Sequence, residues 1–469
     1  MPRRLYVGCA AYAICYAALS ILRFSTFHAQ IDLSYYIRIV WGLAYAHHDV
    51  PLVASPNLIG LHAEPILIPF ALLARLHIPI APLLLVTQAV AVSLLPLPLF
   101  RFAQRHLSQT EPQQSAIAAK QTADPHNASR NEKWSLWLAL GSLLYPTVTV
   151  ATLHDFHPVT LALPFLAAFL DAIDEANHRR ALLFGALALA CREDIALQLA
   201  LTLSGFAMLR AAQRRMYLLI GGLLFLYFAV YIVVIQPRYL PPLGSYALHF
   251  ASNGTKVSSG RDLLMLLLHH PLRFLADQLR VDRLAYVAEL LWPLAFLPLL
   301  GVRFSIGTIP ILGINFLSAF PRVRSIESHY TTAMVPFLLF AAIYGLCRLR
   351  PLFLRARHSE KTTLAVGLVL ALLFVSHLRH GASPLARWGT RYSTDLFVKA
   401  SDDVQVRAAL ALVPEHASVA ARPGPLAHLA ARPRVISPPE YDDGKPVDVI
   451  LTPDAAPREA RIGGQRIIK

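Results

Sequence analysis

The chain has 469 residues, of which 55% are hydrophobic and only 15% are charged, and its mean hydropathy is +0.49. Soluble proteins carry about 25% charged residues, so this composition disfavours a water-soluble enzyme, and the apolar content excludes a disordered chain. The formal net charge is +15, but the basic residues lie mostly in short gaps between apolar segments, which indicates membrane topology rather than nucleic-acid binding. We therefore predict an all-α polytopic membrane protein that binds no nucleic acid.

Eleven apolar segments are candidates for membrane spans, since a crossing helix needs roughly 20 mostly apolar residues. The first runs from Leu5 to about Arg23, and we interpret it as a retained anchor because no small-residue cleavage site follows it. Two short candidates flank the charged triplet Arg192-Glu193-Asp194, so they form either one bent helix or two short helices whose charged ends face a cavity. The later candidates are 80–101, 134–152, 158–175, 180–191, 195–210, 216–236, 282–301, 304–320, 330–347 and 362–378.

Two segments of the first loop are not counted as spans. Residues 64–79 are apolar but broken by proline and too short, so we expect an interfacial or re-entrant segment. Residues 35–46 are typical of an amphipathic surface helix, with these side chains at the headgroup boundary: Tyr35, Ile39, Trp41 and Leu43. With eleven spans, nearly every gap assigned to the cytoplasm is basic. This predicts a cytoplasmic-membrane protein with its N-terminus inside and its C-terminus outside.

The predicted organisation is one multi-pass domain followed by a small tail. Residues 1–378 form the transmembrane part, with an outer loop at 24–79, a cytoplasmic loop at 102–133 and a second outer loop at 237–281. The composition of residues 379–469 is more polar, and we expect a small extracytoplasmic α/β unit there. Its expected elements are a helix at 401–412 and short strands at 417–421, 434–437 and 447–452.

Ionisable residues gather at the predicted outer ends of the helices. Charge near the bilayer is costly and often marks a pathway or a site, and several of these sets could converge on one cavity. The residues are His28, Asp32, Asp49, His62 and Glu64 in the first loop, then His154, Asp155 and His157, then Arg192, Glu193 and Asp194, and finally Arg322, Arg324, Glu327, His329 and Tyr330.

Two kinds of chemistry fit this collection. His154, Asp155 and His157, with Glu64 or Asp32, offer nitrogen and oxygen ligands for a metal ion. His-Asp-x-His lacks the i, i+4 spacing of a strong zinc motif, so no metal ligands are assigned. A general base is better supported, because a carboxylate in a partly dehydrated pocket can deprotonate a hydroxyl while nearby cations hold a phosphate leaving group. Asp32 also suits an N-cap of the helix that follows it.

Short motifs in a fixed order resemble a bacterial family of polytopic membrane proteins of unknown function. They include Ile31-Asp32-Leu33, Leu61-His62-Ala-Glu64-Pro65, Asp155-Phe156-His157-Pro158, Arg192-Glu193-Asp194, His329-Tyr330 and, in the tail, Val447-Asp448-Val449-Ile450. That family in turn resembles the GT-C superfamily, the integral-membrane glycosyltransferases that use polyprenyl-phosphate sugars. The resemblance implies a GT-C-like fold and transfer of a sugar from a polyprenyl-phosphate donor to an extracytoplasmic acceptor in the cell envelope.

The same resemblance implies roles for individual residues. Asp32 would be the catalytic base, and Arg192 and His329 would contact phosphate. The full substrate-binding set implied is His62, Glu64, Asp155, His157, Arg192, Glu193, His329 and Tyr330.

One departure from the GT-C pattern affects the expected cofactor. That superfamily often has a pair of acids in the first outer loop, whereas here Leu33 follows Asp32. The missing acid weakens the case for metal-assisted catalysis more than the case for a simple base mechanism. A divalent metal is therefore only weakly supported as a cofactor. The alternatives to a glycosyltransferase are a transporter or lipid-handling protein, and a non-catalytic membrane scaffold.

Overall fold

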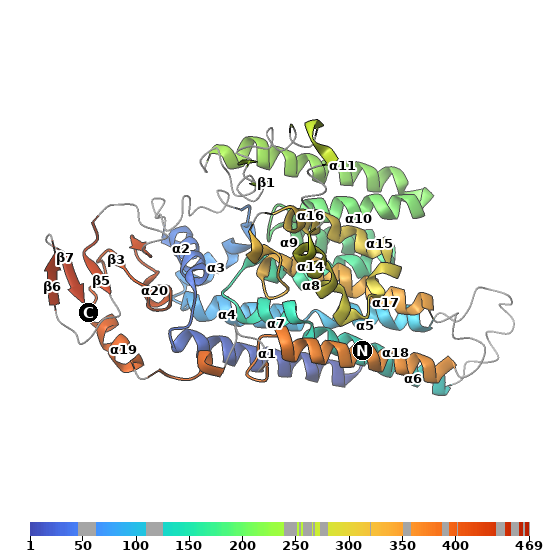
Figure 1. Cartoon of the computed structure of the whole chain (residues 1–469), viewed down its shortest axis with the longest axis horizontal. Helices are drawn as coiled ribbons and strands as arrows, with labels where there is room; N and C mark the ends of the chain where they lie inside the picture. The colour runs from blue at the N-terminus through green and yellow to red at the C-terminus, as the bar shows by residue number, and fades with distance from the viewer. Residues whose placement is uncertain are drawn as a thin grey trace.

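The computed structural model describes residues 1–45, 62–108, 125–238, 280–318, 320–349, 358–386, 394–400, 402–437 and 446–451, with short pieces between 251 and 272 and the strand residues 459–462 and 465–468. The described chain is mainly helical, with a small sheet near its C-terminal end. The helices form an elongated body, and the sheet lies at the end of that body that also carries α2 (Figure 1). The predicted loop residue Asp49 and large parts of the loops 102–133 and 237–281 lie outside the described residues.

Helix α8 is a long, deeply buried helix in the first half of the chain. Fifteen of its 17 residues are buried, and it contacts α4, α5, α9 and α17. The bounds are α1 Arg3–Ser25, α2 Ile31–Tyr45, α3 Ile68–Arg75, α4 Ile80–Ser93, α5 Pro96–Ser108, α6 Pro125–Gly141, α7 Pro146–Leu153, α8 Pro158–Asp174, α9 His178–Leu189, α10 Ile195–Leu209 and α11 Arg214–Val230.

The second half completes the bundle and then leaves it. A six-residue 3-10 helix, η11 (His329–Met334), leads directly into α17 and packs against α8. The α-helices of this half are α14 Val281–Leu291, α15 Val302–Ser305, α16 Ile309–Leu317, α17 Val335–Leu349, α18 His358–His380, α19 Asp403–Ala411 and α20 Pro423–Leu429, and a two-stranded hairpin is formed by β1 Ala251–Ser252 and β2 Thr255–Lys256.

The described residues contain fewer long spans than the sequence predicts. Five helices are long and apolar enough to cross a membrane. The number is six if the helices Ser129–Leu144 and Pro146–Leu153, which meet at a bend of 51°, count as one broken span. The expected number of eleven is not confirmed, because several apolar segments form shorter or interrupted helices. The predicted span 282–301, for example, stops being an α-helix at Leu291 and continues through 3-10 turns that contain Pro293 and Pro298. Proline lacks the amide donor that a continuous helix needs.

The helix predicted at 35–46 is present as α2, but two of the four side chains expected at its surface, Tyr35 and Ile39, are buried, whereas Leu43 is 37% exposed. Tyr35 is 6% exposed and Ile39 is 1% exposed, so neither lies at a headgroup boundary. The reason is that α3 and α20 both pack against α2. Arg38 is also fully buried, and its guanidinium donates to the carbonyl oxygens of Arg432 (2.9 Å) and Pro433 (3.1 Å).

The C-terminal residues form a five-stranded sheet that is attached to the helical body. Its strands are β3 Val419–Ala420, β4 Val435–Ile436, β5 Val449–Leu451, β6 Glu459–Ile462 and β7 Gln465–Ile468, in the order β4-β3-β5-β7-β6, and only the β6–β7 pair is antiparallel. Helix α20 docks closely, since a side chain on Gly424 would meet the carbonyl oxygen of Phe27. His428 stacks on Phe24 with ring centroids 4.0 Å apart. The tail therefore covers the ends of α1 and α2.

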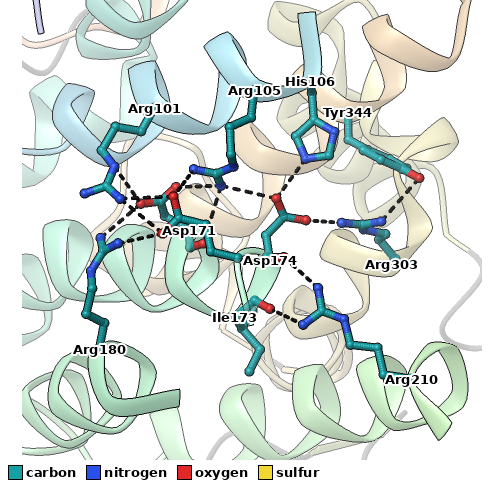
Figure 2. Close-up of polar contacts among 11 residues, drawn as sticks. Arg101, Arg105, His106, Asp171, Ile173, Asp174, Arg180, Arg210, Arg303 and Tyr344 are labelled. Atoms are coloured by element: carbon teal, nitrogen blue, oxygen red, sulfur yellow. Dashed lines mark hydrogen bonds and ion pairs between the residues drawn. The ribbon is translucent and has the colours of Figure 1, made fainter. Parts of the chain in front are cut away.

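A network of ion pairs surrounds the C-terminal end of α8 (Figure 2). The buried carboxylate of Asp171 pairs with Arg105 (2.7 Å), Arg180 (3.1 Å) and Arg101 (3.4 Å). Three arginines from two other helices, α5 and α9, are thereby fixed to α8. Their side chains are between 27% and 37% exposed, whereas that of Asp171 is not exposed at all.

The same end of α8 is closed by further contacts. Asp174 accepts a hydrogen bond from His106 (2.8 Å) and pairs with Arg303. Arg210 donates to the last carbonyl oxygens of α8, at Ile173 (2.8 Å) and Asp174 (2.6 Å), which have no partners within the helix. All of these arginines belong to the gaps counted as cytoplasmic in the sequence, and they gather at one end of the bundle. The side of the membrane that this end faces stays a prediction.

Asp171→Asn should destabilise the folded protein, because it removes the buried one of the two carboxylates that the three arginines share and leaves them sharing only the partly exposed Glu175. The expected loss lies between that of an exposed and a fully buried pair, about 2–4 kcal/mol, and would appear as a lower melting temperature of the protein in detergent micelles. Asp282→Asn is the control, since the Asp282 carboxylate is 49% exposed and solvent can replace its contacts with Arg280 and Arg324. Equal melting temperatures of the two variants would contradict this role of Asp171.

Candidate functional site

The N-terminal end of α8, opposite the arginine network, follows a turn that its sequence holds in an extended conformation. Pro146 starts α7 and Pro158 starts α8, and the residues next to these prolines are kept out of the helical region. Gln88 of α4, which is fully buried, fixes this turn. Its side chain donates to the carbonyl of Thr152 (3.1 Å) and accepts from the amide of His157 (3.0 Å). The turn is therefore rigidly placed, about 25 Å along α8 from the arginine network.

Asp155 at the centre of this turn points inward and is fully buried. It accepts hydrogen bonds from Arg23 (3.1 Å) and from the backbone amides of Gln30 (3.0 Å) and Leu33 (2.9 Å). Asp155 thus binds the first amides of α2, a task that the sequence had suggested for Asp32. These contacts give Asp155 a positioning role, although the sequence placed it in the substrate-binding set.

Asp32 lies in the first turn of α2 and meets three histidines, which we call the Asp32 cluster (Asp32, His154, His157 and His329). Its Oδ2 atom is 3.6 Å from Nε2 of His154 and 3.5 Å from Nε2 of His157. The ring of His329, from η11, stacks on that of His157 at 3.9 Å. The side chain of Asp32 is 36% exposed, whereas His154 and His157 are buried.

The environment sets the protonation of these groups. Burial alone would raise the pKa of the Asp32 carboxyl, but the adjacent rings of His154 and His157 hold that pKa well below its usual range. Burial lowers the pKa of His154 below that of an ordinary histidine. For His157 burial acts in the same direction, but the contact with Asp32 outweighs it and the pKa is raised. Asp32 is therefore an ionised carboxylate at neutral pH.

A second polar group lies beside the first, and we call it the Glu64 cluster (Tyr36, His62, Glu64 and Glu193). The fully buried Glu193 accepts from Nδ1 of His62 (2.8 Å) and from the amide of Ala63 (2.9 Å). Glu64 accepts from the hydroxyl of Tyr36 (3.0 Å). The Tyr36 ring also stands edge-on to that of His157, with centroids 5.7 Å apart, so it links the two clusters.

The remaining predicted residues lie at the edge of these clusters. Arg192 forms a two-pronged pair with Asp194, with distances of 2.6 and 2.7 Å, and this pair was missing from the sequence-based assignment. Tyr330 packs against the ring of His329 at 4.1 Å. The structure thus brings together every residue of the predicted set, and it adds His154 and Tyr36. His154 had been considered only as a metal ligand, and no sequence pattern singled out Tyr36.

The Glu64 cluster has unusual acid–base properties. Burial raises the pKa of Glu64 to about 7, and the charge of Glu193 acts in the same direction while His62 opposes it. Burial would also raise the pKa of Glu193, but His62 lowers it below the ordinary value. At neutral pH the two carboxyl groups therefore differ, with Glu193 ionised and Glu64 close to half protonated.

The raised pKa of Glu64 predicts a pH-dependent stability. The folded chain holds this proton more tightly than the unfolded chain does, so stability falls as pH rises from about 4.5 to about 7. Glu64→Gln carries no charge and keeps an oxygen that can accept from Tyr36. We expect the variant to be more stable than wild type by about 1–3 kcal/mol at pH 8 and nearly equal at pH 5, measured as melting temperature in detergent.

Glu415→Gln is the control for this comparison, because Glu415 is exposed on the tail and should change stability little at either pH. If Glu64→Gln were no more stabilising at pH 8 than at pH 5, Glu64 would not carry a raised pKa in the folded chain.

The geometry leaves two kinds of chemistry for the Asp32 cluster. Its exposed carboxylate can accept a proton from a bound hydroxyl. Its one oxygen and three nitrogens also form the only group of three or more His, Cys, Asp or Glu side chains within the described ranges whose ligand atoms converge, all within 4.8 Å of one another.

Comparison with known proteins agrees with a membrane protein. A protein family described as "Predicted membrane protein (DUF2079)" matches residues 23–461, which include both clusters. No curated protein matches the chain. The match confirms the resemblance to a family of polytopic membrane proteins of unknown function, and it covers nearly the whole sequence. The chain belongs to this DUF2079 family of membrane proteins.

Proposed function

We propose that this membrane protein is a GT-C-like glycosyltransferase, which moves a sugar from a polyprenyl-phosphate carrier to an acceptor outside the cytoplasm. The proposal depends above all on the position of Asp32. Its carboxylate is 36% exposed and ionised, while His154 and His157 beside it are buried and His157 is fixed by hydrogen bonds to Gln88 and to the Asp155 carbonyl. A rigidly held carboxylate that solvent can reach is what a general base requires.

The reaction assigns a place to each proton and bond. The acceptor hydroxyl gives its proton to the Asp32 carboxylate while its oxygen forms a bond to the anomeric carbon of the sugar. The bond between that carbon and the phosphate oxygen breaks, and polyprenyl phosphate leaves with the electron pair. Arg192 would contact this phosphate as a charged donor, and hydrogen bonds from charged donors to phosphate are the strong ones. His329 would contact it as a neutral ring, because burial and the neighbouring rings of His157 and His154 lower its pKa well below that of an ordinary histidine.

A lipid-linked donor must reach the site from the bilayer, and α11 offers an apolar outer surface along which its lipid chain can lie. Helix α11 belongs to the span Ala211–Arg238. Only 11% of the apolar stretch of this span is buried inside the protein, so its leucine and valine side chains face outward. Leu223 is 66% exposed and Val233 is 72% exposed. Tyr231, in contrast, is 1% exposed and lies close enough to Glu193 and Glu64 to sense their charges. One side of this span thus suits lipid, and the other borders the Glu64 cluster.

A transporter or lipid-handling protein is the alternative, and the distribution of charge favours it less. Transporters place their polar sites near the middle of the membrane. Here the described ionisable groups of the two clusters and of the arginine network lie at the two ends of α8, and the residues between them are mostly apolar and buried. We assign the Asp32 end to the outer side of the cytoplasmic membrane, because the arginine network occupies the other end.

Asp32→Asn should abolish transfer while leaving the protein folded. Asparagine cannot accept the proton, and loss of a general base typically costs about 10²–10⁴-fold in rate. The start of α2 stays capped by Asp155, so the amount of protein in the membrane should remain near that of wild type. The measurement is transfer of a labelled polyprenyl-linked sugar, or restoration of a cell-envelope glycan that a deletion strain lacks, with protein level measured in parallel.

Asp402→Asn is the matched control, since Asp402 is an exposed carboxylate on the tail and its loss should not change transfer. Wild-type transfer by Asp32→Asn would remove Asp32 as the base. Loss of the Asp32 variant from the membrane would instead indicate that the carboxylate is structural.

A further inference from the structure

The Asp32 cluster assembles its four side chains from three separate parts of the chain: α2, the α7–α8 turn and η11. We infer that Asp32, His154, His157 and His329 bind one divalent transition-metal ion of the zinc class. Sequence reasoning placed Asp155 in such a site, but that carboxylate is turned inward and bound to Arg23. His329 takes its place, from a segment far along the sequence.

The distances suit a compact cation site. In a tetrahedral zinc site with bonds of 2.0–2.1 Å, neighbouring ligand atoms are about 3.3 Å apart. Asp32 Oδ2 already lies 3.5 and 3.6 Å from two of the imidazole nitrogens, and all four ligand atoms lie within 4.8 Å of one another. The three rings are stacked, with interplanar angles of 8°, 16° and 20°, so binding one ion requires the imidazoles to turn until their in-plane lone pairs meet at it.

Hydrogen bonding at His157 orients its second nitrogen toward the site. Its Nδ1 atom is 2.8 Å from the carbonyl oxygen of Asp155, which can only accept, so Nδ1 carries a proton. Nε2 is therefore the nitrogen that faces the Asp32 carboxylate, and in the neutral ring its lone pair is available to a cation shared with that carboxylate. A second hydrogen-bond partner on the non-ligating nitrogen is also what metal-binding histidines have.

The close packing of the three rings favours a metal ion over protons on several rings as the source of positive charge in the cluster. His329 and His154 lie with ring centroids 3.9 and 5.3 Å from that of His157. Protonating these rings together would place like charges side by side in a buried region. One metal ion shared by all four groups supplies the charge once and uses each lone pair.

The chemistry of the ligands selects the class of metal. Three imidazoles and one carboxylate suit zinc and its neighbours in the transition series, whereas magnesium, calcium and manganese prefer sets of oxygen ligands. The inference stands without the proposed function, because metal binding needs neither donor nor acceptor. It is also compatible with it, since a cation bound through one oxygen of Asp32 leaves the second oxygen to accept a proton.

The test uses the full-length protein, purified in detergent without a histidine tag and stripped with a chelator. Titration with Zn²⁺ should give one bound ion per chain and raise the melting temperature, as a ligand of the folded state does. Co²⁺ should give the visible absorption of a four-coordinate nitrogen and oxygen site. His157→Ala and His329→Ala should each weaken Zn²⁺ binding at least about 100-fold, because loss of an outer partner alone costs about 10–100-fold.

His416→Ala, on the exposed surface of the tail, should bind Zn²⁺ as wild type does. The inference is overturned if wild type binds no stoichiometric Zn²⁺, if the two site variants bind it as tightly as wild type, or if Mg²⁺ or Mn²⁺ binds more tightly than Zn²⁺. If a histidine variant does not fold, two other measurements decide: the wild-type protein should show the Co²⁺ absorption of a four-coordinate site, and Asp32→Asn should bind Zn²⁺ more weakly than wild type. A chain that binds Zn²⁺ but transfers no sugar would contradict only the proposed function.

Discussion

The buried carboxylate of Asp155 is the contact on which the arrangement of the site depends. It joins the end of α1, through Arg23, to the first amides of α2, through Gln30 and Leu33. A buried charge is tolerated only when its hydrogen-bonding capacity is met, and here α2 meets it by starting at this point. Asp32, one residue before Leu33, is thereby placed against His157, which follows Asp155 by two residues. The geometry of the Asp32 cluster is a consequence of this anchoring.

Helix α8 separates two opposite electrostatic environments. Its N-terminal end carries the histidine-rich turn, and its C-terminal end carries Asp171 and Asp174 among arginines. Between them the helix is apolar and packed on all sides, so it acts as a spacer of about 25 Å. Each end is stabilised by its own polar partners, and neither needs charge in the middle of the bundle. We propose that this division lets one end carry the chemistry while the arginines at the other end orient the protein in the membrane.

The sequence was sufficient to identify a membrane protein and to group most of the site, because motifs such as Asp32 and His329 lie at helix ends that meet in space. The orientation of Asp155 could not be predicted, since adjacent residues in an extended turn face opposite ways. Arg38 shows a second limit: its partner at Arg432 lies nearly 400 residues away, so nothing local reveals that α2 is covered. The predicted number of spans is not confirmed within the described residues, because hydropathy does not register breaks in a helix such as that at Pro293.

Cross-linking between positions 154 and 329 tests most directly whether these distant segments form one site. The two rings are 5.5 Å apart in the structure although 175 residues separate them in sequence. His154→Cys and His329→Cys would be combined in a chain whose native cysteines are replaced, and treated with dibromobimane, which fluoresces only when both its arms have reacted. We expect fluorescence in the double variant and none in either single variant. A double variant whose thiols both react with a maleimide but give no bimane fluorescence would contradict the convergence of these segments.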